Sequence, residues 1–344
     1  ILDSDTPSQP TEFELKLYIN GKKYIYQLIL SPKDILSEKL HVYNSNQPSL
    51  LMHRELVDSN TALKFNQSLI KVSAAVKDEL TAKCLKNMSL FAARKAVNCN
   101  LGEIDDVRDW MINHTLPVID LGQKMFNYAE RNMLENPDAK KHLLDFCHNI
   151  GFNIEDMAVE KDYMSLTPEM IQFIKSSGQL SDENASKLSK DPKMPNGFKT
   201  DFIVSVINKR GKEIYTLPKA SQSEGTLRAM GIETALYVAE QNNKLLPIDE
   251  IETSMHPLLL KFMIQSFLKV QSRSQLLLTT HYDPLFTAVD DYLRKDSFWL
   301  MDKRDDGHSE LYPLISKNGV NKMRSLQRAY LNNKLGALPQ IANV

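Results

Sequence analysis

Two short apolar stretches of the sequence each end in side chains that could take part in phosphoryl transfer. Residues 245–248 are followed directly by Asp249 and Glu250, and residues 275–280 are followed by His281. In phosphoryl transfer one carboxylate holds Mg²⁺, usually through water, and a second orients or deprotonates the attacking water. A neutral imidazole could hydrogen-bond the terminal phosphate or that water. Asp249 is therefore the candidate magnesium residue, and Glu250 and His281 are the candidate catalytic residues.

A third candidate segment, at residues 223–226, opens a strongly helical stretch. The N-terminus of a helix presents free N–H groups and partial positive charge to phosphate, and a glycine there lets the backbone approach a ligand closely. Ser223, Gly225 and Thr226 are therefore candidate nucleotide-binding residues. An ordinary serine cap would explain the helix start equally well. Acidic residues or a histidine after a strand are also common in caps and turns, so the order of the three segments carries the functional interpretation.

A phosphate-binding loop of the pattern G-x-x-x-x-G-K-[ST] is absent from the sequence. The two Gly-Lys dipeptides, Gly21-Lys22 and Gly211-Lys212, lack the upstream glycine and the following Ser or Thr, and both fall in predicted hairpin turns. We expect a strand, a phosphate-binding loop and a helix to lie upstream of Ile1. The alternative is a degenerate subunit that lends its helix start at 223–226 to the site of a partner.

The elements that must position these residues divide the sequence into parts of different character. Residues 12–53 contain alternating apolar side chains, as strands do, with a predicted hairpin turn at Asn20-Gly21. Residues 77–177 carry apolar side chains at helical spacing, interrupted by Pro117. From Ser221 onward helix and strand alternate, as in α/β domains. Helices are predicted at 77–97, 105–134, 138–150, 167–177 and 227–241, further strands at 39–44, 49–53, 200–206 and 213–217, and a loop at 181–196.

The predicted fold class is α/β, with a core that is interrupted by a helical insert. Residues 1–58 form the β-rich N-terminal part of the core, and residues 59–197 form the helical insert. Residues 198–344 form the C-terminal part of the core and contain all the candidate site residues. This order, with β-rich sequence on both sides of a helical segment, is what an inserted lobe produces.

Composition excludes several classes of protein. The 344 residues contain 42 Lys and Arg against 43 Asp and Glu, so no overall basic field for nucleic acid is indicated. Three cysteines without C-x-x-C spacing predict neither a disulfide framework nor a zinc ribbon. No apolar run approaches the roughly 18–20 residues that cross a bilayer. We expect a soluble, cytoplasmic protein with no membrane partner.

Together these segments resemble the AAA/ABC-type ATPases of bacterial abortive-infection and anti-phage defence systems, which are related to the SMC-like and OLD-type ATPases. Residues 223–228 resemble the family's signature, residues 248–252 with His256-Pro257 its Walker B motif and D-loop, and residues 279–281 its switch histidine. The resemblance also covers residues 10–15, Tyr24, Tyr26 and residues 37–40, which are similar to the region after the family's first helix, and residues 328–331 and 336–339, which are similar to its C-terminal tail.

The resemblance implies an ABC-type ATPase head with a mixed sheet and an antiparallel β subdomain, which binds ATP and Mg²⁺. It also implies a head-to-head homodimer or higher oligomer with two ATP molecules between the subunits. Ser223, Gly225 and Thr226 would then contact the nucleotide of the opposite subunit. The implied partner is an effector, commonly a nuclease of TOPRIM-like or HNH fold, and DNA or a phage protein is a candidate trigger.

Two alternative functions remain at this stage. An SMC- or RecF-like ATPase in DNA repair would need a long heptad coiled coil or a basic DNA channel, whereas the predicted insert is short and balanced in charge. A non-hydrolysing scaffold would keep the ATPase fold only to assemble partners. The missing phosphate-binding loop favours the scaffold, and the presence of Asp249, Glu250 and His281 argues against it.

Overall fold

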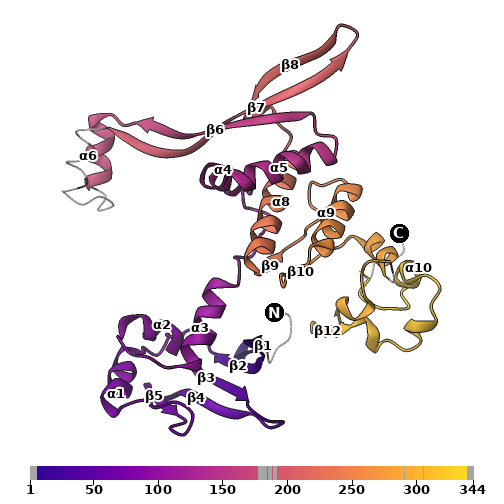
Figure 1. Ribbon diagram of the computed structural model, residues 1–344. Helices are drawn as coiled ribbons and strands as arrows, with labels where there is room; N and C mark the ends of the chain where they lie inside the picture. The colour runs from indigo at the N-terminus through magenta and orange to yellow at the C-terminus, as the bar shows by residue number, and fades with distance from the viewer. Residues whose placement is uncertain are drawn as a thin grey trace. The chain divides into compact units, whose positions relative to one another are not determined.

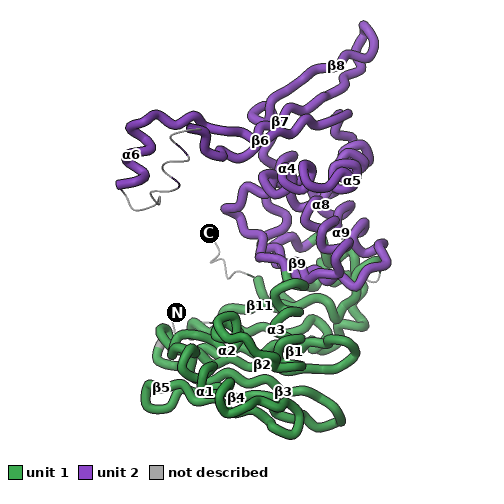
Figure 2. The backbone as a smooth tube through the Cα atoms, turned by 60° about the vertical axis from the view of Figure 1, so that its left-hand side comes forward, with its two compact units in different colours: residues 1–115, 284–344 green, residues 116–283 purple. Residues whose placement is uncertain are grey.

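The computed structural model describes residues 6–176, 184, 188, 192–289, 291–304 and 306–338. The chain forms two compact units, one made of Ile1–Thr115 and Pro284–Val344 and the other of Leu116–Asp283 (Figure 2). The boundaries between these units differ from the boundaries of the three parts predicted from the sequence. The predicted boundaries remain a prediction. Among the described helices, none combines the length and the apolar character that crossing a membrane requires.

The N-terminal part of the first unit is an antiparallel sheet of five strands in sequence order (Figure 1). The predicted first hairpin is confirmed, because Asn20 and Gly21 have φ values of 50° and 80°, the left-handed conformation that a type I′ turn requires. The two further strands are longer than predicted because each continues to pair with its neighbour. The strands are β1 (Thr11–Ile19), β2 (Lys22–Leu30), β3 (Ile35–Tyr43), β4 (Ser49–Val57) and β5 (Asn60–Phe65).

Three helices, α1 (Ala74–Lys83), α2 (Leu90–Ala93) and α3 (Glu103–Asn113), contribute apolar side chains to the core of this sheet. Leu40 and Leu90 belong to the same core cluster and are completely buried. The predicted helix at 77–97 is therefore divided into α1 and α2, and the predicted helix at 105–134 is divided as well. Its second half is a separate helix in the other unit, because the chain between the two is extended around Pro117.

The C-terminal part of the first unit contains β11 (Trp299–Lys303), β12 (Ser309–Pro313) and the short helix α10 (Leu326–Leu331). The two strands are antiparallel, and Leu300 belongs to a small core with apolar side chains from α10. Trp299 on β11 is 58% exposed. Successive side chains of a strand point to opposite faces, so burial of Leu300 directs Trp299 outward.

The second unit is built around α8 (Glu224–Asn242), which is buried along much of its length. The helices α4 (Phe126–Glu135), α5 (Pro137–Asn149) and α9 (Pro257–Lys269) pack around it (Figure 1). Gly231 makes the closest of these contacts possible, since an added Cβ would lie 2.5 Å from the backbone of Met125. The predicted helices at 138–150 and 227–241 are confirmed as α5 and α8.

An antiparallel ribbon of three strands, in the order β6-β7-β8, extends from the helices of the second unit (Figure 1). The second predicted hairpin is confirmed as β7 and β8, and both strands are longer than expected. The strand β6 was not predicted, so residues 59–197 hold β5, β6 and the start of β7 as well as helices. The predicted loop at 181–196 lies mostly outside the described residues. The elements are β6 (Ile154–Ser165), α6 (Pro168–Ser176), β7 (Lys193–Asn208) and β8 (Gly211–Pro218).

Candidate active site

The two apolar stretches that end in candidate site residues are neighbouring parallel strands. In β9 (Leu245–Ile248) and β10 (Gln275–Leu278), Leu245 is in register with Gln275 and Ile248 with Leu278. The carboxyl ends of both strands therefore meet at one edge of the sheet, where ligands of α/β proteins bind. Asp249 and Glu250 leave this edge from β9, and the segment that leads to His281 leaves it from β10.

Asp249 is fixed from both sides. Its backbone N–H donates to the carbonyl oxygen of Ile119 at 2.8 Å, because residues near 119 run parallel to β9 as an additional edge. On the other side, the hydroxyl of Thr279 donates to Oδ1 of Asp249 and accepts the backbone N–H of Glu250 at 2.9 Å. A hydroxyl has one proton to donate, so the two hydrogen bonds are compatible. Thr279 is thus a positioning residue that sequence reasoning had not identified.

Glu250 has a left-handed backbone conformation, with φ of 45°. For a residue other than glycine this conformation is sparsely populated and costs on the order of 1–3 kcal/mol, and such residues concentrate at functional sites. The strain is maintained by the tight turn that follows, in which the N–H of Thr253 donates to the carbonyl of Glu250 at 3.1 Å. The sequence alone does not indicate this strain, because Asp and Glu after a strand are also ordinary turn residues.

Glu252 connects the two strand ends. One of its carboxylate oxygens accepts the hydroxyl of Thr280 at 2.6 Å, and the other accepts the backbone N–H of His281 at 2.7 Å. The carboxylate therefore holds the backbone of His281 beside the 249–255 turn. The imidazole of His281 is on an exposed residue and has no hydrogen-bond partner among the described residues. Glu252 was noticed in the sequence only as part of a motif, and its hydrogen bonds could not be predicted from spacing.

The helix start at 223–226 packs against the same turn. Ser223 is the N-cap of α8, and its hydroxyl accepts the N–H of Thr226 at 3.1 Å. The structural role that the sequence allowed for this serine is therefore present, and its exposed position leaves it accessible to a second molecule as well. Gly225 makes the packing possible, since an added Cβ would lie 2.4 Å from the carbonyl oxygen of Ser254.

We expect Gly225→Ala to destabilise the second unit, because the new methyl group would overlap a backbone oxygen that cannot move alone. Overpacking of this kind costs about 1–3 kcal/mol. The matched control is Gly122→Ala, where the nearest atom would lie 3.5 Å away and φ is not left-handed. Thermal unfolding should show a lower midpoint for Gly225→Ala and a nearly unchanged one for Gly122→Ala. Equal midpoints would contradict the close approach between α8 and the 249–255 turn.

Arg228 places a cation beside the site. This arginine had not been singled out from the sequence as a functional residue. Its terminal nitrogens lie 3.5 Å from the carbonyl oxygens of Asp120 and Glu250, and its Nε is buried without a partner among the described residues. Burial lowers the pKa of Arg228, while the charges of Asp120 and Glu250 act in the opposite direction. The site therefore contains a partly buried cation beside the backbone of Glu250.

The donors at this edge fit part of a magnesium–nucleotide site. Among the described residues there is no cluster of three or more His, Cys, Asp or Glu side chains that could hold a metal ion alone. Mg²⁺ bound with a nucleotide keeps several waters and needs only one or two carboxylates from the protein. Asp249, fixed at the strand end, meets that requirement. The remaining ligands would have to be water and phosphate oxygens.

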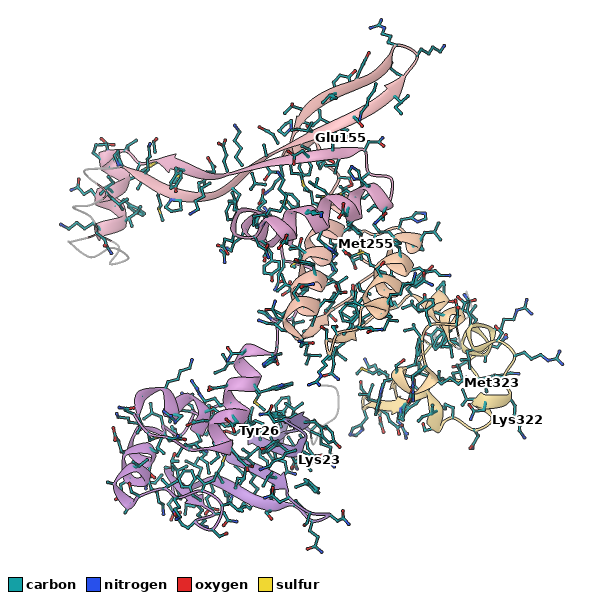
Figure 3. The ribbon with its side chains drawn as sticks, in the orientation of Figure 1. Lys23, Tyr26, Glu155, Met255, Lys322 and Met323 are labelled. Carbon is teal, nitrogen blue, oxygen red and sulfur yellow. The ribbon has the colours of Figure 1, made fainter. Side chains whose placement is uncertain are left out.

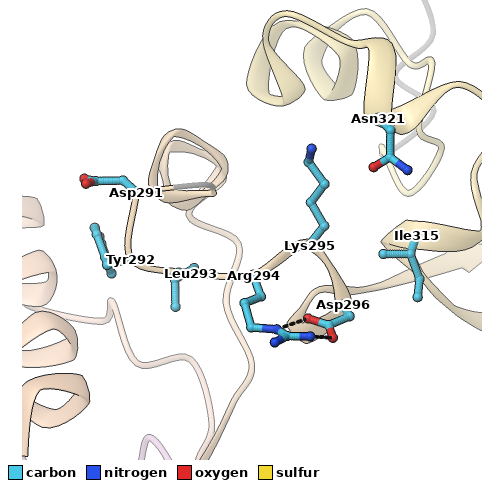
Figure 4. Close-up of a pocket in the computed structure, with 8 residues that line it drawn as sticks. All are labelled: Asp291, Tyr292, Leu293, Arg294, Lys295, Asp296, Ile315 and Asn321. Atoms are coloured by element: carbon cyan, nitrogen blue, oxygen red, sulfur yellow. Dashed lines mark hydrogen bonds and ion pairs between the residues drawn. The ribbon is translucent and has the colours of Figure 1, made fainter.

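A separate hollow lies in the C-terminal part of the first unit (Figure 4). Arg294 and Asp296 form a charged fork in it, in which Nε of the guanidinium lies 2.8 Å from Oδ1. None of the predicted site residues lines it, and Asp296 offsets the charge of Arg294, so we assign it no function. The lining residues are Asp291, Tyr292, Leu293, Arg294, Lys295, Asp296, Ile315 and Asn321.

Comparison with protein families supports the interpretation of this chain as an ATPase. Residues 1–287 match the model of the family described as "AAA domain, putative AbiEii toxin, Type IV TA system". That range contains α8, β9, β10 and all the candidate site residues. A search of curated proteins found no match. Because the match covers 287 of the 344 residues, the chain belongs to this family of AAA domains, which is named for the AbiEii toxin of type IV toxin–antitoxin systems.

Proposed function

We propose that this chain is the ATPase subunit of an anti-phage defence or toxin–antitoxin complex, and that it hydrolyses ATP between two copies of itself. The observation that carries the proposal is the meeting of three segments at one sheet edge. Asp249 and Glu250 follow β9, the segment to His281 follows β10, and the start of α8 packs on the turn between them. Membership of an AAA-domain family supports ATP and Mg²⁺ as the cofactors.

Each side chain has a distinct role in the proposed reaction. Asp249, held by Thr279 and by the backbone of Ile119, would bind Mg²⁺ through water. Mg²⁺ bound with ATP neutralises the negative charge on the phosphate oxygens. Glu250 would polarise the attacking water and accept its proton. His281, whose backbone is held by Glu252, would hydrogen-bond the terminal phosphate or the same water.

The start of α8 supports a site that is completed by a second copy. A helix leaves its first N–H groups without partners inside the helix, and the side chain of Ser223 accepts only that of Thr226. The remaining N–H groups and the helix dipole would favour a phosphate. In the proposed dimer, Ser223, Gly225 and Thr226 contact the nucleotide that is bound by Asp249 of the opposite subunit. The resulting assembly is a head-to-head homodimer or a higher oligomer.

The proposed effector is a nuclease of TOPRIM-like or HNH fold, contacted through residues 59–197. This segment exposes large apolar side chains near α6, where Phe173 is 73% exposed and Met170 47% exposed. Exposed apolar side chains of this size favour a protein contact. Co-purification of the full-length protein with a nuclease encoded beside it would test this part of the proposal. A nuclease that fails to associate would leave the ATPase proposal standing and remove the effector.

The dimer proposal predicts that two inactive subunits can restore activity to each other. Ser223→Arg should block closure at the helix start, and Glu250→Gln should prevent proton transfer, so each mutant homodimer is expected to be nearly inactive. A heterodimer of the two carries both changes in one composite site and neither change in the other. Phosphate release by purified heterodimers should therefore recover to about half of the wild-type rate if the two sites act independently.

The control for this experiment is a heterodimer in which one subunit carries both Ser223→Arg and Glu250→Gln and the other is wild type. In that heterodimer each composite site carries one of the two substitutions, so the whole heterodimer should be inactive. Activity in the control and none in the mixed heterodimer would mean that the helix start acts within its own subunit. Inactivity of both would mean that the two sites must act together.

A further inference from the structure

The hairpin of β7 and β8 continues beyond the N-terminal end of β6 as a two-stranded ribbon. The pairing of β7 with β6 ends at Val204, whereas its pairing with β8 continues to Asn208 and Gly211. Figure 1 shows this end of the hairpin extending away from the helices of the second unit. Ile207 is 86% exposed and Ile214 is 64% exposed. A two-stranded ribbon with exposed apolar side chains is marginally stable alone and is typical of a contact surface.

The tip of this ribbon is basic. Lys209 and Arg210 occupy the turn, both are exposed, and neither side chain forms an ion pair with a described residue. Lys212 follows them and forms an ion pair at 2.8 Å with Glu155. Glu155 is labelled in Figure 3. Glu155 is therefore engaged at the base of the ribbon, and the carboxylate of Glu213 on β8 accepts the hydroxyl of Tyr215. The turn itself carries two positive charges without an ion pair among the described residues.

The shape and charge of the tip together favour duplex DNA. The major groove of B-form DNA, about 12 Å wide, admits a two-stranded β-ribbon, whereas the deep and narrow major groove of double-stranded RNA does not. Lys and Arg at the turn would contact phosphates on the sides of the groove, which is the main source of affinity for DNA. Ile207, on the strand beside them, would contact the apolar edges of bases such as the methyl group of thymine.

The same hairpin leads directly into the start of α8. Strand β8 ends at Pro218, and a short 3₁₀ helix, η3 (Lys219–Ser221), precedes Ser223. Glu130 on α4 is completely buried and fixes this connection, since its two oxygens accept hydrogen bonds from Nζ of Lys219 at 2.9 and 2.8 Å. The hydroxyl of Thr200 on β7 donates to the same carboxylate at 2.6 Å. Both strands of the hairpin are thus anchored by one buried group just before the helix start.

We propose that residues 208–212 bind duplex DNA in its major groove, and that the binding is transmitted through Thr200, Glu130 and Lys219 to the start of α8. The second half of this statement rests on the proposed ATPase function, and the first half does not. Bound DNA would change the position of β8 and hence of Ser223. ATP turnover of the full-length protein is therefore expected to change when duplex DNA is added.

The test compares two pairs of substitutions in the full-length protein. Lys209→Gln with Arg210→Gln removes the two charges of the tip. Lys161→Gln with Lys193→Gln removes two exposed charges from the part of β6 and β7 that lies away from the tip, where neither lysine has an ion pair with a described residue. Affinity for a short labelled DNA duplex is measured by fluorescence anisotropy at several salt concentrations. A third variant, Thr200→Val, removes the hydroxyl that contacts Glu130 and preserves the shape of the side chain.

The tip variant should lose about tenfold or more in affinity, and its salt dependence should fall by about 0.9 for each lost phosphate contact. The opposite-end variant should bind within about twofold of wild type. Thr200→Val should bind DNA normally while the effect of DNA on ATP turnover is reduced. Equal losses in both lysine variants, equal binding of double-stranded RNA, or no binding by the wild-type protein would each overturn the proposed DNA contact.

Two further outcomes separate this inference from the proposed function. If the protein bound DNA but did not turn over ATP, the ATPase proposal would be wrong and the proposed DNA contact at the tip would still hold. ATP turnover without DNA binding would remove only the contact, and would direct attention to an acidic protein surface as the partner of Lys209 and Arg210. If DNA changed the ATP turnover of Thr200→Val as much as that of the wild-type protein, the route through Glu130 would be excluded.

Discussion

Glu250→Gln is expected to lower ATP turnover by the full-length protein by about 10²–10⁴-fold, the usual contribution of a general base. The amide has nearly the same shape as the carboxylate but cannot accept a proton from the attacking water. Binding of ATP should be retained, because Asp249 and its contacts with Thr279 and Ile119 are unchanged. Phosphate release at saturating ATP measures turnover, and equilibrium binding of a labelled ATP analogue measures affinity.

The matched control for this experiment is the same change two residues further along. Glu252→Gln keeps one oxygen that can accept a hydrogen bond, so it should loosen the segment of His281 and lower turnover less than Glu250→Gln does. Asp249→Ala should instead weaken the binding of the magnesium–nucleotide complex. Unchanged turnover in Glu250→Gln, together with a large loss in Glu252→Gln, would show that the general base had been assigned to the wrong carboxylate.

The parts of the site that could be predicted from the sequence depend on local patterns. An apolar stretch bounded by polar residues is sufficient to identify β9 and β10, and Ser223 before a long helical pattern is sufficient to identify the start of α8. The Asn20-Gly21 turn fixes the first hairpin for the same reason. These features are encoded within a few neighbouring residues, so no knowledge of tertiary contacts is needed to find them.

The parts that could not be predicted depend on contacts between distant residues. Thr279 reaches Asp249 across neighbouring strands, and Ile119 reaches the same residue from a segment that the sequence only marks as a break in a helix. The burial of Arg228 and the strain at Glu250 are likewise visible only in three dimensions. Local sequence does not specify such pairs, since the residue types involved occur equally often in turns and on surfaces.

The strand β6, which the sequence did not predict, and the exposed side chain on β10 have different explanations. The strand β6 was not recognised because most of its side chains are exposed, so it lacks the regular alternation of a strand with one buried face. Leu277 on β10 is 59% exposed although it lies in an apolar stretch typical of a strand covered on both faces. Its exposure reflects that, among the described residues, β10 has a hydrogen-bonded neighbour only in β9.

The N-terminal sheet of the first unit contains two completely buried charged residues, and removing the cation should have the largest effect on stability. Glu38 on β3 and Arg54 on β4 lie directly opposite each other and are both completely buried. The guanidinium donates to the carbonyl oxygens of Ile35, Leu85 and Lys86. Burial raises the pKa of Glu38, and its hydrogen bonds and the charge of Arg54 oppose that increase.

Arg54→Met should therefore lower the free energy of unfolding by about 3–5 kcal/mol, because it removes the donors to three carbonyl oxygens, at about 1–3 kcal/mol for each group left unsatisfied, and the nearby charge that stabilises ionised Glu38. Lys64→Met is the control, because it removes an exposed cation from the neighbouring strand and its ion pair with Glu55 is worth at most about 1 kcal/mol.

The folded-state pKa of Glu38 is raised, so the stability that this group contributes is lost as pH rises through that pKa. Without Arg54 the pKa rises further, and the deficit of the variant measured by urea unfolding should shrink as the pH is lowered. A deficit that is the same at all pH values would mean that the lost hydrogen bonds to the three carbonyls, and not the lost charge near Glu38, account for the instability.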